Sequence, residues 1–173
     1  MRHRTGLWPL TLLLAMIPLL GYPEGVQFHE ADVKAAFIYN LFKFVEWPAD
    51  AGPAANGALS LCLLDVPHHL REALASLQGK TVDGHRIGLL DYRGRGCHAV
   101  VAGDMVSGAT LEQLASEGTM TIGAEQFIER GGMVGLVTVN NHVRFEFNLT
   151  AARSGNIKLS SHLLKLAERI RGR

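Results

Sequence analysis

The sequence predicts an α/β domain with a mainly parallel sheet that ends in an antiparallel hairpin. Short apolar runs of strand length alternate with stretches of helical periodicity, which is the pattern of consecutive βαβ units. Two further runs near the C-terminus flank Asn140-Asn141, a pair suited to a tight hairpin turn because asparagine tolerates positive φ. The composition, with 47% apolar and 19% charged residues in a chain of 173, is typical of one globular domain.

The first residues have the pattern of a secretory signal peptide. A basic start, Arg2-His3-Arg4, precedes an apolar run over 7–20, which is shorter than the roughly 20 residues that span a bilayer. We expect a signal peptide at 1–24 and a single α/β domain at 25–173, and therefore export of the protein from the cytoplasm. An uncleaved membrane anchor is the alternative interpretation.

The first half of the domain is predicted from its apolar periodicity. Residues 30–46 carry apolar side chains at helical spacing, and Trp47-Pro48 ends this helix because proline disfavours a helical conformation in the residue before it. Ala58–Leu64 is an apolar run, interrupted only by Ser60, that predicts a strand covered on both faces. A second helix is expected from Pro67 to about Leu77, where Gly79 stops it.

The alternation continues to the end of the chain. Further strands are predicted at 85–90, 97–102, 119–122, 133–139 and 142–148. Further helices are predicted at 107–117, 124–130 and 158–170, with one helical turn after Thr150. In the run 142–148 apolar and polar residues alternate, so one face is expected in the core and the other is expected to be polar. The hairpin formed by the last two strands is placed at an edge of the sheet.

The two cysteines, Cys62 and Cys97, lie in or beside apolar strand-like runs. In an exported protein two cysteines in one small domain usually pair, so we expect a structural disulfide. Two interpretations remain open beside it, namely a redox-labile bridge and two unpaired buried thiols. The spacing matches neither a C-x-x-C redox motif nor a zinc site.

No catalytic motif is present in the sequence. G-x-S-x-G, H-E-x-x-H, a P-loop and a complete G-x-G-x-x-G are all missing, and the G-x-G within Tyr92–His98 precedes a strand instead of opening a helix. His68-His69 does not predict a metal site, because adjacent side chains on a helix diverge. A net charge of +1 gives no electrostatic case for nucleic-acid binding. We therefore expect a protein that is not an enzyme and uses no cofactor or metal; a thiol oxidoreductase that acts through Cys97 beside His98 is the enzymatic alternative.

Two groups of residues are candidates for contact with a partner. An edge hairpin offers a docking surface, and the first helix carries aromatic residues on more than one face. The candidate residues are Tyr39, Phe42, Arg144, Glu146, Asn148 and Arg153. The simpler interpretations are a surface ion pair of about 0–1 kcal/mol for Arg144 and Glu146, and burial for Tyr39 and Phe42.

A second hypothesis for function is a small-ligand site. Open α/β sheets bind ligands beyond the carboxyl ends of their parallel strands. In this sequence the predicted strand ends precede Pro67, Tyr92, Gly103 and Gly123. A periplasmic small-ligand-binding module or a sensor accessory protein is therefore the alternative function.

Three blocks of the sequence resemble the YfiR family of exported bacterial proteins. They are VKAAFIYNLFKFVEWP (33–48), GKTVDGHRIGLLDY followed by GCHAVVAG (79–103), and GGMVGLVTVNNHVRFEFNLTAARSGNIKLSSHLLKLA (131–167). The blocks occur in the same order as in the family and cover nearly the whole predicted domain.

The resemblance implies a fold, a location and a function. It implies a Rossmann-like three-layer domain in the periplasm that represses a membrane-bound diguanylate cyclase by binding the enzyme's periplasmic sensor domain. Loss of such repression raises cyclic-di-GMP and favours biofilm formation. The partners implied are this cyclase or another sensor protein. A homodimer is considered on other grounds, namely the aromatic residues of the first helix. Cys62 and Cys97 match one of the two disulfides of the family's namesake. The second pair has no cysteines here, so the resemblance does not imply redox tuning through that bridge.

Overall fold

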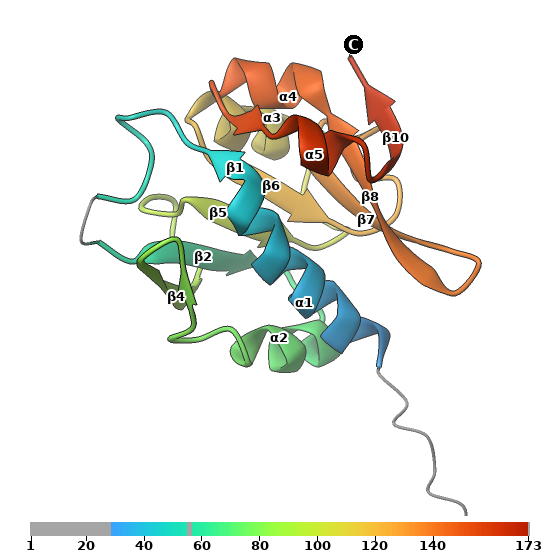
Figure 1. Ribbon diagram of the computed structural model, residues 1–173, viewed down its shortest axis with the longest axis horizontal. Coiled ribbons are helices and arrows are strands. Elements are labelled where there is room, and N and C mark those ends of the chain that lie inside the picture. Colours follow the sequence, from blue (N-terminus) through green and yellow to red (C-terminus); the bar gives the residue numbers. More distant parts are fainter. Residues whose placement is uncertain (1–28, 55–56, 173) are drawn as a thin grey trace, which may run out of the picture.

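The computed structural model describes residues 29–54 and 57–172, so the predicted signal peptide at 1–24 lies outside the described residues. A central eight-stranded sheet lies between α1 (Glu30–Leu41) and α2 (His68–Ala75) on one face and α3 (Gly108–Ser116) on the other (Figure 1). The predicted α/β fold with three layers is confirmed.

The sheet has the strand order β10-β8-β7-β6-β5-β2-β4-β3. Its strands are β2 (Leu59–Leu64), β3 (Thr81–Val82), β4 (His85–Asp91), β5 (Ala99–Ala102), β6 (Met120–Gly123), β7 (Val134–Val139), β8 (His142–Asn148) and β10 (Ala167–Arg171). From β4 through β2, β5 and β6 to β7 every neighbouring pair is parallel. The edge strand β3 and the strand β8 are antiparallel to their neighbours β4 and β7. The sheet is therefore mainly parallel, as predicted.

Alternate residues of the central strands supply two cores. Leu61 and Val101 face α1 and α2, whereas Cys62 and Val100 face α3. Strands that bury both faces read as continuous apolar runs, which explains why the sequence pattern located them. Cys62 and Cys97 form a disulfide with a Cα–Cα distance of 5.8 Å, which confirms the predicted pairing.

The predicted hairpin is present, but it does not end the sheet. Asn140 and Asn141 have φ values of 49° and 60°, which suits the tight turn between β7 and β8. Outside β8 lies β10, which pairs with it in parallel. The last strand of the chain, and not the hairpin, therefore forms this edge of the sheet.

The prediction of one helix over 158–170 is wrong. That segment forms β9 (Lys158–Leu159), the short helix α5 (Ser161–Leu164) and β10. Leu159, Leu163 and Leu166 have helical spacing, but the chain leaves the helix after α5 and gains hydrogen bonds to β8 instead. Pairing between distant segments has thus overridden local periodicity.

Two other predicted helices differ in the structure. The helix predicted over 30–46 ends at Leu41, where one 3₁₀ turn (Phe42–Phe44) leads into β1 (Val45–Glu46), and β1 pairs with β9 in a separate two-stranded sheet. Residues 124–130 form turns and no helix, and Gln126 has a φ of 58°. The Phe127 ring fills the space beside Gly123 and Gly132, where a Cβ atom would overlap it. The helical turn after β8 is present as α4 (Leu149–Ser154).

Candidate functional site

The connections of the sheet diverge between β2 and β5. The chain leaves β2 through α2 toward β4 on one side, and it leaves β5 through α3 toward β6 on the other. Open α/β sheets place their ligand sites in the crevice at such a topological switch point, beyond the carboxyl ends of the strands. Here the two connections touch, because a Cβ atom on Gly103 would overlap the carbonyl oxygen of Asp65.

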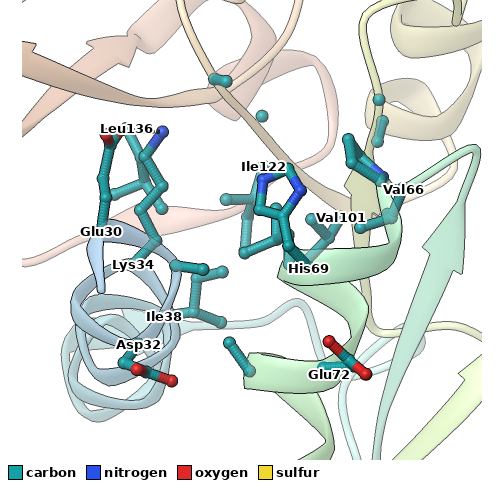
Figure 2. A pocket seen from close by; sticks show the side chains of 18 of the residues that line it. Glu30, Asp32, Lys34, Ile38, Val66, His69, Glu72, Val101, Ile122 and Leu136 are labelled. Atoms are coloured by element: carbon teal, nitrogen blue, oxygen red, sulfur yellow. Dashed lines mark ion pairs between the residues drawn. The ribbon is translucent and has the colours of Figure 1, made fainter. Parts of the chain in front are cut away.

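A pocket of about 820 Å³ lies at this switch point. Figure 2 shows it between the N-terminal parts of α1 and α2, with the ends of the central strands behind them. Its apolar lining comes from α1, from the loop after β2, and from strands β5, β6 and β7: Ile38, Val66, Val101, Ile122 and Leu136. The volume lies within the roughly 300–1,000 Å³ that small-molecule sites occupy.

One side of the pocket carries an ion pair. Lys34 Nζ lies 2.7 Å from Glu30 Oε1 one helical turn away, and the Lys34 side chain is only 14% exposed. The Thr138 hydroxyl donates a hydrogen bond of 2.8 Å to the same carboxylate oxygen and so ties α1 to the end of β7. These hydrogen bonds, the one from Lys34 first, lower the pKa of Glu30. Glu30 is therefore held as a carboxylate that neutralises Lys34.

The other polar groups at the pocket are mostly carboxylates. Asp32 on α1, Glu72 on α2 and Asp104 after β5 line it together with His29 and His69. Figure 2 shows Asp32 and Glu72 on the two helices, on the side of the pocket away from Glu30 and Lys34, and it shows the His69 ring above the ends of the strands. The site therefore combines an apolar floor with an acidic rim.

Arg130 fixes the loop that follows β5. Its Nη1 donates hydrogen bonds to the carbonyl oxygens of Asp104 at 2.6 Å and Val106 at 3.1 Å, and its guanidinium stacks on Phe127 at 5.5 Å. Met105, at the tip of this loop, is 86% exposed. The loop is therefore anchored at its base, while an apolar side chain projects from its tip beside the pocket.

The polar residues predicted on β8 do not share an open face. Arg144 is exposed, but Glu146 and Asn148 are only 7% and 6% exposed because β10 and α4 cover them. Glu146 accepts two hydrogen bonds of 2.9 Å from Arg169 on β10. Asn148 Oδ1 accepts the backbone N–H groups that begin α4, so its side chain is the N-cap of that helix.

The other three candidate residues also make contacts within the fold. The Tyr39 hydroxyl donates to the Thr81 carbonyl oxygen at 2.8 Å and so holds the edge strand β3. Phe42 is 1% exposed, and Arg153 donates a hydrogen bond of 2.6 Å to the Gly172 carbonyl oxygen beside β10. Since β3 and β10 are opposite edges of the sheet, the structure does not bring the six residues together. Their role in partner binding stays a prediction.

The polar groups around the disulfide make hydrogen bonds to other parts of the fold. His98 Nδ1 accepts the Ser60 backbone N–H at 2.9 Å, and the Trp47 indole N–H donates to the His98 carbonyl oxygen at 3.2 Å. Burial lowers the pKa of His98. Cys97 is held in the bridge to Cys62, so the thiol that an oxidoreductase would need is not free.

Within residues 29–54 and 57–172, no cluster of three or more His, Cys, Asp or Glu side chains is arranged to hold a metal ion. In the same residues no helix has the length and apolar character needed to cross a bilayer.

The pocket was only partly predictable from the sequence. We expected four residues that follow strand ends at a ligand site. Three of them line the pocket, namely Pro67, Gly103 and Gly123, whereas Tyr92 does not. The contributions of α1, above all Glu30 and Lys34, were missed. Their spacing of four residues indicates an ion pair on a helix, but only the packing of α1 against α2 places that pair at the sheet.

Comparison with known families gives a match over most of the chain. A family model described as YfiR/HmsC-like matches residues 31–168. No curated protein matches the sequence.

Proposed function

Because this chain belongs to the YfiR/HmsC-like family, we propose that it is a periplasmic regulator of cyclic-di-GMP signalling that represses a membrane-bound diguanylate cyclase. In this proposal it binds the periplasmic sensor domain of the cyclase and holds the enzyme inactive, which limits biofilm formation. The observation that carries the proposal is the family match over residues 31–168.

Two features of the chain support action outside the cytoplasm. The pattern of residues 1–24 is typical of a signal peptide. The bridge between Cys62 and Cys97 is of a kind that persists in oxidising compartments and is rare in the cytosol. A regulator that meets the outer part of a membrane enzyme has to be in that compartment.

Deletion of the gene in its host tests the proposal. We expect cyclic-di-GMP, measured by mass spectrometry of cell extracts, to rise on deletion and to return to its original level when the full chain is restored. The matched control is the same chain without residues 1–24, which should not restore repression because it stays in the cytoplasm. An unchanged cyclic-di-GMP level after deletion would show that the proposed function is wrong.

Partner contact can be tested at the exposed end of the hairpin. Arg144 is the candidate residue on β8 whose side chain reaches solvent, so Arg144→Glu should weaken co-purification with the cyclase from membranes without unfolding the protein. Arg93→Glu, an exposed charge reversal on the loop after β4, is the matched control. Equal co-purification of both variants with the wild type would remove β8 from the proposed interface. Light scattering of the purified protein would show whether it is also a homodimer.

A further inference from the structure

We propose that the pocket at the switch point binds a small organic cation. The apolar body of the ligand would lie on the floor formed by the strand ends, and its protonated amine would lie at the acidic rim between Asp32 and Glu72. Binding at this site does not depend on the proposed contact with a cyclase. The small molecule would be a second kind of partner for the protein.

The floor sets the size and polarity of the ligand. Ile38, Val101 and Ile122 close the bottom of this pocket of about 820 Å³ with apolar side chains that are only 0%, 2% and 0% exposed. A body of about ten carbon atoms fits such a volume. It would cover the apolar lining side chains that still reach water, among them Ala31 and Leu70, and this removal of apolar surface from water favours binding.

The charges around the pocket set the sign of the ligand. The lining holds four carboxylates, on Glu30, Asp32, Glu72 and Asp104, against the single ammonium of Lys34, with the histidines counted as neutral. Glu30 and Lys34 neutralise each other at 2.7 Å, so the pair offers neither charge to a ligand. The remaining three carboxylates give the rim an excess of negative charge.

Three contacts or effects oppose this excess without reversing it. His68 Nδ1 lies 3.5 Å from Glu72 Oε2, and like the other histidines it is counted as neutral. The N-termini of α1 and α2 both reach the pocket, and each contributes about half a positive charge. Arg130 lies 3.7 Å from Asp104 and offsets that carboxylate. The helix ends and Arg130 together supply about two positive charges against three negative ones, so the balance still favours a cation.

The position of the rim fits a ligand with a charged end and an apolar body. Figure 2 shows the carboxylates of Asp32 and Glu72 on the two helices at one side of the pocket, and Val101 and Ile122 farther up in the view, on the central strands. The Glu30–Lys34 pair lies on the opposite side. A ligand that enters between α1 and α2 would therefore bury its apolar part and keep its amine beside the two carboxylates.

Three compounds with one shared apolar body test the sign of the ligand. 4-Phenylbutylamine, 4-phenylbutanol and 5-phenylpentanoate share a phenyl ring and four methylene groups and differ only in their end group, which is cationic, neutral or anionic. We expect calorimetric titration of the full periplasmic protein to give the tightest Kd for the amine, about three- to tenfold below that of the alcohol, and the weakest for the carboxylate. Added salt should reduce the preference for the amine, because rim charges are exposed and therefore screened.

Matched variants locate the binding. Asp32→Asn together with Glu72→Gln should remove most of the preference for the amine over the alcohol, whereas Glu168→Gln on β10 should leave it unchanged. Ala31→Trp should weaken binding of all three compounds at least tenfold by filling the pocket, whereas Ala36→Trp, on the exposed side of the same helix, should not. If Ala31→Trp unfolds the protein, Ala31→Leu is the smaller filling variant.

Three outcomes would overturn the inference. They are the absence of binding by every compound, a preference for 5-phenylpentanoate, and unchanged binding in a folded variant at position 31. None of these outcomes depends on a cyclase. If no compound binds but gene deletion raises cyclic-di-GMP, the inference about the pocket is wrong and the proposed function is still supported. Conversely, amine binding without any effect of deletion on cyclic-di-GMP would support the pocket and refute the proposed function.

Discussion

The contact between β8 and β10 gives the sharpest test of the described fold. Glu146 has a side chain 9% exposed and accepts two hydrogen bonds of 2.9 Å from Arg169, whose side chain is 51% exposed and also pairs with Glu129. We predict that Arg169→Met lowers the free energy of unfolding by about 2 kcal/mol, because it leaves the Glu146 carboxylate buried without its partner. This value lies between the 3–5 kcal/mol typical of a broken buried pair and the 0–1 kcal/mol of an exposed one, since only one partner is buried.

A double-mutant cycle separates the pair from other effects of the substitutions. Glu146→Met removes the buried carboxylate, so adding Arg169→Met to it should cost much less than Arg169→Met alone, with a coupling of about 1–2 kcal/mol. The free energies come from urea unfolding followed by circular dichroism, with Arg93→Met as a control on an exposed loop. Equal costs of Arg169→Met in both backgrounds would refute the pairing of β10 with β8. A helix over 158–170 would place Arg169 away from Glu146 and give that result.

Three further predictions use the same unfolding measurements. Replacing both Cys62 and Cys97 by alanine should lower the unfolding free energy by about 3–4 kcal/mol, because the bridge closes a loop over a separation of 35 residues; a loss below about 1 kcal/mol would contradict this estimate. Because burial lowers the pKa of His98 below its usual 6.5, the folded state favours the neutral ring, and stability should fall as the pH drops below about 6.5, more steeply than in His98→Gln; identical pH profiles would rule out this role. Asn148→Ala should cost about 1 kcal/mol by removing the N-cap of α4, whereas Asn148→Ser should retain most of the cap, and equal losses would show that the cap is not the cause.

The parts of the fold that were predicted correctly are those in which local pattern and tertiary structure agree. The run Ala58–Leu64 is almost entirely apolar because β2 has a strand on each side and helices on both faces of the sheet, so its burial is visible in the sequence. The segment 158–170 carries conflicting signals: its leucines have helical spacing, but its second half is an edge strand. An edge strand with Glu168, Arg169 and Arg171 is mostly polar, as edges often are, and it lacks the apolar run that reveals a central strand.

Only those residues of the candidate site that follow directly from the order of the strands were predictable. Strand ends follow from the strands themselves, so Pro67, Gly103 and Gly123 could be expected at one edge of the sheet. The residues of α1 could not, because nothing in its sequence says which part of the sheet it covers. Polar alternation on β8 likewise predicted an open face at Glu146, since a neighbouring strand that follows much later in the chain leaves no local signal.

The contacts that close the structure join its beginning to its end. Thr138 donates to Glu30 across 108 positions of the chain, and β1 pairs with β9, which follows it by more than a hundred residues. Such contacts raise the contact order, and proteins with high contact order fold more slowly because long loops must close before the contacts stabilise the chain. Until β9 and β10 are available, β1 has no partner and β8 is an open edge. The two sheets can therefore be completed only after the last strands of the chain, β9 and β10, have formed.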